Sequence, residues 1–110
     1  MSILRLIPFL KYGKSGIEID GVSYERIIEK YGTPVFVFSK QRFEENIHAL
    51  RLAFEQPFSS FKLAFAFKAN TVLPILKIAA QNGLLAEVMS EFELHLAELA
   101  AFKSEDIIFN

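Results

Sequence analysis

The feature that most constrains the fold is an alternation of two sequence patterns that begins after residue 34. Short apolar runs stand at residues 35–38, 63–67, 85–89 and 107–109, and stretches with apolar residues at helical spacing lie between them. The runs start roughly 20 to 28 residues apart, which is the size of a βα unit. The alternation therefore predicts an α/β fold with an all-parallel sheet.

Local signals predict where the helices begin and end. Ser23 is a suitable N-cap for a first amphipathic helix, which Gly32 terminates. A second helix over residues 43–54 carries one apolar stripe, and a third is closed by Gly83. A fourth runs from about Glu91 to Phe102.

The residues before this alternation form a distinct segment. Isoleucines alternate over residues 17–19 and an Asp-Gly pair follows, which indicates a short strand and a turn. Residues 1–10 lack the long apolar centre and the small-residue cleavage site of an export signal. We expect an N-terminal segment over residues 1–22 and the main fold over residues 23–110.

Composition excludes several classes of protein. Although 52% of the residues are hydrophobic, no apolar run approaches the roughly 18 residues of a membrane span. Twelve basic and thirteen acidic residues are scattered along the chain, so nucleic acid is not an expected partner. The absence of cysteine excludes disulfides and thiolate metal sites, and it fits a cytoplasmic protein.

Four strands of this kind fit either a small doubly wound sheet or half of a barrel. A complete eight-stranded barrel needs roughly 250 residues, and this chain has 110. A doubly wound domain would normally end with a helix that covers its last strand, whereas this chain stops after the run at 107–109. The ending favours half a barrel, whose exposed edges should drive self-association.

The most informative stretch for chemistry is the second strand and the residues after it. Strand side chains alternate between faces, so bulky Leu63, Phe65 and Phe67 should meet the helices. The opposite face begins with alanines and ends with Lys68 and Asn70 at the carboxyl end of the strand, where sites of parallel α/β folds lie.

A lysine in this place has two interpretations. Desolvation favours the neutral form of an amine, which can attack a carbonyl and form a Schiff base. Alternatively, Lys68 simply emerges into solvent where the strand ends. The residues alone leave both open.

Residues 65–70, Phe-Ala-Phe-Lys-Ala-Asn, resemble the Tyr-Ala-Val-Lys-Ala-Asn signature of the fold-type III pyridoxal-phosphate decarboxylases, in which the lysine carries the cofactor. Residues 31–38 resemble the Tyr-Gly-Thr-Pro-Leu-Tyr-Val-Tyr segment of diaminopimelate decarboxylases. Residues 83–94 are similar to the Gly-x-x-x-Asp-x-x-Ser-x-x-Glu-Leu segment of the family, and residues 106–110 resemble the strand before its Gly-Pro-x-Lys turn.

The resemblance implies the N-terminal part of an alanine-racemase-like (β/α)8 TIM barrel, truncated after about four strands. It implies that Lys68 holds pyridoxal 5′-phosphate and that Asn70 and Ser90 lie at the cofactor. Glu87 and Glu93 map onto acidic positions that would hold and tune the amine. For Glu93 the alternative is a solvated residue in a first helical turn, and for Ser90 it is a simple N-cap.

The sequence also departs from the family pattern. Glu87 replaces an aspartate and residues 91–92, Glu-Phe, replace a Gly-Gly pair, which predicts a stiffer loop and leaves the substrate open. His48 and His95 match no cofactor-stacking histidine and are expected at the surface. We expect most of the aromatic residues in the core, and we find no metal-ligand cluster and no glycine-rich phosphate loop in the sequence.

By resemblance, the activity is decarboxylation of an amino acid, with diaminopimelate to lysine the first choice, in a full-length homodimer. The phosphate-binding loop, the partner of the ring nitrogen and the C-terminal β-domain of the family would all lie beyond Asn110, so we expect the 110 residues to be inactive alone. Two alternatives stay open. One is a non-decarboxylating relative such as a racemase or a pyridoxal-phosphate carrier, and the other is a small α/β binding module without cofactor.

Overall fold

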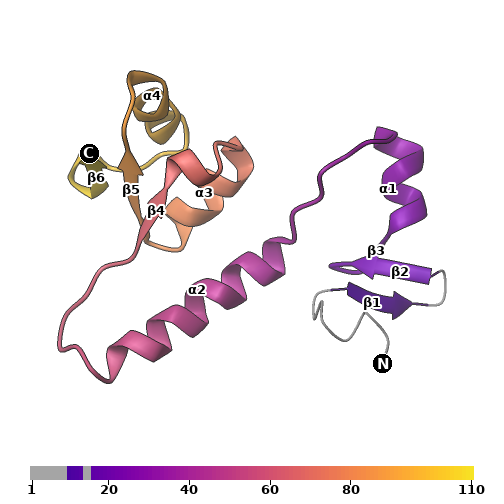
Figure 1. Ribbon diagram of the computed structural model, residues 1–110, viewed down its shortest axis with the longest axis horizontal. Helices are drawn as coiled ribbons and strands as arrows, with labels where there is room; N and C mark the ends of the chain where they lie inside the picture. Colours follow the sequence, from indigo (N-terminus) through magenta and orange to yellow (C-terminus); the bar gives the residue numbers. More distant parts are fainter. Residues whose placement is uncertain (1–9, 14–15) are drawn as a thin grey trace. The chain divides into compact units, whose positions relative to one another are not determined.

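The computed structural model describes residues 10–13 and 16–110. The expectation about an export signal therefore lies almost wholly outside the described residues. The chain divides into two compact units, Met1–Phe43 and Glu44–Asn110. The elements, drawn in Figure 1, are β1 (Leu10–Gly13), β2 (Gly16–Ile19), β3 (Val22–Ser23), α1 (Tyr24–Tyr31), α2 (Lys40–Glu55), β4 (Ala64–Ala66), the 3₁₀ turn η2 (Phe67–Ala69), α3 (Leu73–Gln81), β5 (Leu85–Val88), α4 (Glu91–Leu99), the 3₁₀ turn η3 (Ser104–Asp106) and β6 (Ile107–Phe109).

The first unit begins with a small antiparallel sheet in the order β1-β2-β3. Asp20 and Gly21 form the turn between β2 and β3 with φ angles of 49° and 78°, which confirms the predicted strand and turn. β1 was not predicted from the sequence. The domain boundary expected after residue 22 stays a prediction.

Helix α1 begins and ends where the sequence predicts. The Oγ of Ser23 accepts a hydrogen bond of 3.4 Å from the N–H of Arg26. At the other end Gly32 has a φ of 74°, and its N–H donates to the carbonyl of Ile28 at 2.8 Å. Glycine is favoured there because it adopts positive φ without steric cost.

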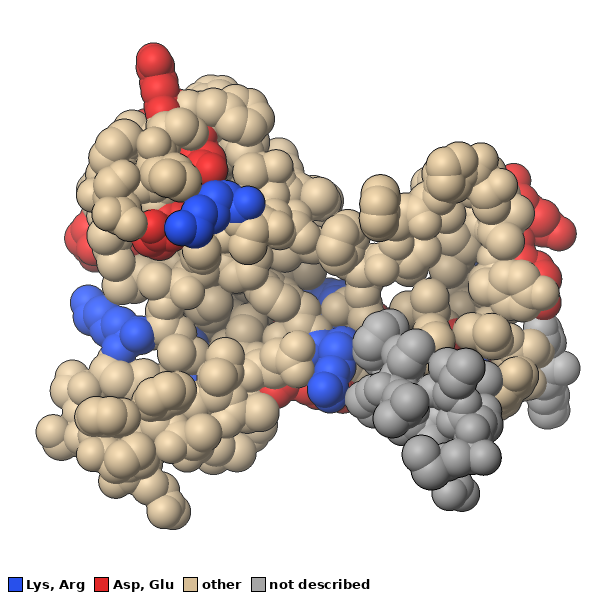
Figure 2. All heavy atoms as spheres, in the orientation of Figure 1, with Lys and Arg blue, Asp and Glu red and all other residues tan. Residues whose placement is uncertain are grey.

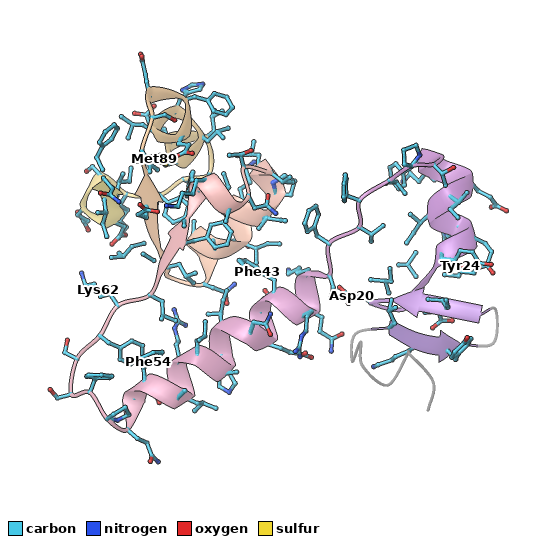
Figure 3. All side chains as sticks on the ribbon, viewed as in Figure 1. Asp20, Tyr24, Phe43, Phe54, Lys62 and Met89 are labelled. Atoms are coloured by element: carbon cyan, nitrogen blue, oxygen red, sulfur yellow. The ribbon has the colours of Figure 1, made fainter. Side chains whose placement is uncertain are left out.

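The start of α2 is capped by two side chains. The Oγ of Ser39 accepts from the N–H of Arg42 at 2.9 Å and donates to Oδ1 of Asp20 at 2.6 Å. The other oxygen of Asp20 accepts from the N–H of Gln41 at 3.2 Å, and Figure 3 shows Asp20 beside this end of the helix. The turn between β2 and β3 is thereby tied to the first turn of α2, where a carboxylate also complements the helix dipole.

Residues 35–38 form no strand, so this prediction was wrong. Phe36 is 92% exposed and Phe38 54% exposed, and no strand in the described part of the chain pairs with them. An apolar run becomes a strand only where its N–H and C=O groups find a ladder partner. The parallel sheet consequently holds three of the four expected strands.

The second unit is built on the parallel sheet β4-β5-β6, with β5 in the middle (Figure 1). Helices α3 and α4 pack against β5 and against each other. The largest fully buried side chains are Phe67, Leu76 and Val88, from η2, α3 and β5. The core therefore lies between one face of the sheet and the two helices, as expected for βα units.

Helices α3 and α4 end in the same way. After α3, Gly83 has a φ of 68°, and the N–H groups of Gly83 and Leu84 donate to the carbonyls of Ala80 and Ala79. After α4, Ala101 takes this position with a φ of 65°. Both ends are Schellman motifs, in which a residue with positive φ reverses the chain.

The fourth predicted helix was too long at its C-terminal end. Helix α4 stops at Leu99, and the N–H groups of Ala101 and Phe102 donate to the carbonyls of Glu98 and Ala97 at 2.9 and 3.0 Å. Because the chain reverses there, Phe102 turns into the core and its ring lies 5.6 Å from that of Phe67. An alanine gives no sequence signal for such an ending.

The expectation that most aromatic residues are in the core was also wrong. Among the described residues, Phe67 and Phe102 are the only buried aromatic side chains. Seven of the described aromatic residues are more than half exposed: Tyr12, Tyr31, Phe36, Phe38, Phe58, Phe92 and Phe109. A side chain is buried only where other elements pack against it, so apolar character alone does not predict burial.

The part of α2 in the second unit is joined to the end of α3. Ile47 is 4% exposed, Arg51 donates to the carbonyl of Asn82, and the Nδ2 of Asn82 lies 3.5 Å from Oε1 of Glu44. These contacts place one side of α2 against α3 and leave much of the predicted apolar stripe, including Leu50 and Phe54, exposed.

Candidate cofactor site

The carboxyl ends of β4, β5 and β6 lie along one edge of the sheet because the strands are parallel. The residues that follow these ends are Lys68 to Asn70, Met89 to Ser90, and Asn110. Of the residues predicted to carry chemistry, Lys68, Asn70 and Ser90 stand in these segments, and Glu87 and Glu93 lie within three residues of them. This edge is therefore the candidate site.

The sheet has one covered and one open face. In the register, Phe65 lies beside Ala86 and Ala86 beside Ile107, and Ala86 is fully buried toward the helices. The alternate row is Ala66, Glu87 and Ile108, and Ile108 is 44% exposed. Burial alternates along β5, so Glu87 projects from the open face. The alternation predicted over residues 63–70 extends only to Ala66, because the chain then turns into η2.

Lys68 stands one turn beyond the strand on which it was predicted. Strand β4 ends at Ala66, and the 3₁₀ turn η2 contains Phe67, Lys68 and Ala69. Phe67 is fully buried and anchors the turn through edge-on contacts with Phe65 and Phe102. The side chain of Lys68 is exposed, and it makes no hydrogen bond or ion pair with any residue in the described ranges.

Asn70 connects this turn to α3. Its N–H donates to the carbonyl of Phe67 at 3.0 Å, and its Oδ1 accepts from the N–H of Val72 at 2.9 Å. Val72 is the N-cap of α3 but has no capping side chain of its own. Asn70 thus fixes the path of the chain directly after Lys68. Asparagine often stabilises turns in this way, by accepting a hydrogen bond from the backbone two residues further on.

Glu87 is held by a residue that the sequence interpretation missed. Its Oε1 accepts a hydrogen bond of 3.0 Å from Nδ2 of Asn110. The backbone of Asn110 is itself fixed, because its N–H donates to the carbonyl of Val88 at 2.8 Å. Its position could have identified Asn110 as a candidate site residue, because Asn110 directly follows a predicted strand, as Lys68 does.

Ser90 and Glu93 shape the turn between β5 and α4. The Oγ of Ser90 accepts from the N–H of Glu93 at 3.2 Å, so the N-cap interpretation of Ser90 is confirmed. The Oε2 of Glu93 accepts from the N–H of Met89 at 2.8 Å, and Figure 3 shows Met89 where β5 ends below α4. Glu93 is only 8% exposed, so the solvated alternative for this residue was wrong.

Charge at this edge is unevenly distributed. On the strands and the turns that follow them, residues 64–70, 85–90 and 107–110, Lys68 is the one cationic residue. Glu87 lies on β5, and Glu91 and Glu93 begin α4. On the face drawn in Figure 2, the basic side chains stand in small groups, some of them beside acidic side chains, and form no large basic patch.

Other classes of site are not found in the described residues. Both histidines are exposed as predicted, and Nδ1 of His95 lies 3.7 Å from a carboxylate oxygen of Glu98. Among the residues that the structure describes, no group of three or more His, Cys, Asp or Glu side chains could hold a metal ion. Within the same ranges, no helix combines the length and the apolar character needed to cross a membrane.

The fold and the site agree with one family of proteins. Residues 41–110 match the profile of the family described as "Pyridoxal-dependent decarboxylase, pyridoxal binding domain". This match covers more than half of the chain. The chain therefore belongs to the family of pyridoxal-binding domains of pyridoxal-dependent decarboxylases.

The most similar relatives include diaminopimelate decarboxylases of archaea. The chain is 38% identical over 94 residues to the diaminopimelate decarboxylase of Archaeoglobus fulgidus, a match that covers 86% of this chain and 22% of that protein. It is 36% identical over 96 residues to the enzyme of Methanocaldococcus jannaschii, covering 84% of this chain and 22% of that protein. The chain thus spans about a fifth of the length of these relatives.

Solved structures show the same likeness in three dimensions. The crystal structure of the M. jannaschii diaminopimelate decarboxylase superposes with a TM-score of 0.83 at 31% identity, covering 94% of this chain and 25% of that one. The same enzyme in complex with L-lysine gives a TM-score of 0.84 at 32% identity, covering 92% of this chain and 24% of that one. The parallel α/β unit is therefore part of the TIM-barrel fold of this family, as predicted.

The residues at the edge fit one end of pyridoxal phosphate, the cofactor of this family. The aldehyde requires a primary amine that is not bound to another side chain, and the amine of Lys68 meets this requirement among the described residues. The phosphate requires cationic or N–H donors, and the strand ends offer no second cation. The side chains at this edge therefore fit the aldehyde carbon of the cofactor. They provide no cationic side chain besides Lys68 to bind its phosphate.

Proposed function

We propose that this chain contributes the cofactor lysine of a pyridoxal-phosphate-dependent amino-acid decarboxylase and that Lys68 is that lysine. The observation that carries the proposal is the place of Lys68. Its amine stands without a partner among the described residues at the carboxyl edge of a parallel sheet, inside the segment 41–110 that matches the family. An unpaired amine at this edge is available to attack the carbonyl of an aldehyde.

The neighbouring residues have distinct proposed roles. Asn70 and Ser90 are proposed to lie at the cofactor, where they fix the chain at the starts of α3 and α4. Glu87 and Glu93 supply negative charge that would hold and tune the amine after a substrate displaces it from the cofactor. When bound, pyridoxal phosphate supplies an electron-accepting ring that stabilises the charge left by the departing α-carboxylate.

For the substrate we propose diaminopimelate, which would yield lysine. The support is the relatives named above, which are diaminopimelate decarboxylases, one of them crystallised with L-lysine. We further propose that the 110 residues are inactive alone, because they span only about a fifth of the length of the decarboxylases that they match. A complete protein would act as a cytoplasmic homodimer on a small amino acid.

A chimera tests this function. This chain replaces the matching segment of the A. fulgidus diaminopimelate decarboxylase, and carbon dioxide release is measured with diaminopimelate, lysine, ornithine and arginine. We expect release from diaminopimelate, and its loss in the Lys68→Ala chimera. Cofactor binding without release from any of the four substrates would favour the racemase or carrier alternative. Carbon dioxide release by the isolated chain would contradict the proposal that it is inactive alone.

A further inference from the structure

Lys68 and Glu87 carry opposite charges at the same edge of the sheet but are not paired. Ala66 is the cross-strand neighbour of Glu87, and Lys68 follows Ala66 by two positions. In the described structure the carboxylate of Glu87 is bonded to Asn110. The amine of Lys68 has no ionic partner within the same ranges.

The two side chains are close enough to pair. Ala66 lies about 5 Å from Glu87 across the strands. Lys68 follows Ala66 by two residues within η2, which adds at most about 7 Å, so the Cα atoms of Lys68 and Glu87 lie within roughly 12 Å of each other. Extended lysine and glutamate side chains together can bridge a separation of this order. Lys68 is the one cationic residue of the strand ends. A Glu87 carboxylate that lost its hydrogen bond to Asn110 would therefore form an ion pair with Lys68.

We propose that Asn110 is a positioning residue that keeps the amine of Lys68 free by holding the carboxylate of Glu87. Its backbone N–H is fixed to the carbonyl of Val88 at 2.8 Å, which sets the side chain beside β5. Its Nδ2 then donates to Oε1 of Glu87 at 3.0 Å. A carboxylate that accepts this bond is oriented toward β6 and away from η2.

The consequence concerns the reactivity of the amine. An ammonium group held by a carboxylate loses its proton less readily, and only the neutral amine attacks a carbonyl. Removal of the Asn110 side chain would release Glu87 to capture Lys68 and slow its reactions. The role of this restraint in catalysis rests on the proposed function, whereas the restraint itself can be measured without cofactor.

The test is pulse labelling of the whole chain with acetic anhydride, followed by mass spectrometry of its peptides. The readout is the labelling of Lys68 relative to Lys77, an exposed lysine on α3. We expect Asn110→Ala to lower this ratio about two- to fivefold, the effect of an exposed ion pair. In the Glu87→Gln background the same substitution should have no effect. Asn46→Ala, which removes an exposed asparagine on α2, serves as the control and should leave the ratio unchanged.

Two outcomes would overturn the proposal. One is a ratio that stays the same or rises in Asn110→Ala. The other is a fall that persists in the Glu87→Gln background, since Glu87 would then not be the group that captures Lys68. Acetic anhydride labels amines whether or not a cofactor binds, so this test does not depend on the proposed function. The proposed function fails in a different experiment, if pyridoxal phosphate modifies wild-type protein at lysines other than Lys68.

Discussion

The carboxylate of Glu93 accepts a hydrogen bond of 2.8 Å from the backbone N–H of Met89, across the turn that joins β5 to α4. Together with Ser90, whose Oγ accepts from the N–H of Glu93, this bond closes the turn from both sides. The arrangement is a variant of the capping box, with the acid reaching one residue further back than usual. It fixes the loop at the candidate cofactor edge.

Loss of this bond should destabilise the chain. Glu93→Ala leaves a partly buried N–H without an acceptor, which costs about 1–3 kcal/mol of the free energy of unfolding. Glu93→Gln retains an acceptor and should cost less. The control is Glu91→Ala, an exposed acid in the same first turn, expected to cost under about 1 kcal/mol. Urea unfolding followed by circular dichroism measures all three, and equal losses for the two alanine variants would contradict this role.

Replacement of Ala101 by glycine should stabilise the folded chain. Ala101 has a φ of 65°, the place that Gly83 takes after α3, and an L side chain is strained in this region. Ala101→Gly should raise the free energy of unfolding by about 0.5–1 kcal/mol. Ala100→Gly next to it, at a φ of −82°, should give no gain. The explanation fails if the two variants have the same stability.

The open face of the sheet should drive self-association. Strands β4 and β6 each pair with β5 alone in the described structure, and Ile108 stands 44% exposed on the uncovered face. Light scattering at increasing concentration should report oligomers. Ile108→Lys should reduce them more than Leu99→Lys, which alters an exposed residue of α4. A monomer at every concentration would count against the prediction.

Local signals in the sequence were sufficient for part of the fold. The cap of Ser23 and the ending at Gly32 involve residues only a few positions apart in the chain, and β6 begins at the predicted residue, Ile107. The alternation of faces predicted over residues 63–70 ends at Ala66, where the chain turns into η2. Residues 35–38 failed because a strand depends on a partner, which an apolar run does not specify.

The site was predictable to a similar extent. The positions of Lys68 and Ser90 followed from the sequence pattern, because each stands at the end of a strand or the start of a helix. The bond between Asn110 and Glu87 depends on the register of β5 and β6, across 23 positions of the chain. The burial of Glu93 likewise depends on how α4 packs, which no local pattern encodes.

The most direct test of the central claim is to mix the chain with pyridoxal phosphate, reduce it with borohydride and map the modified peptides. Wild-type protein should develop a visible absorbance band and carry a pyridoxyl group on Lys68, and Lys68→Arg should lose both. Exposed lysines such as Lys62 and Lys77 serve as internal controls. Modification confined to Lys68 is the predicted result, whereas modification spread over many lysines, or none, would contradict the assignment of Lys68 as the cofactor lysine.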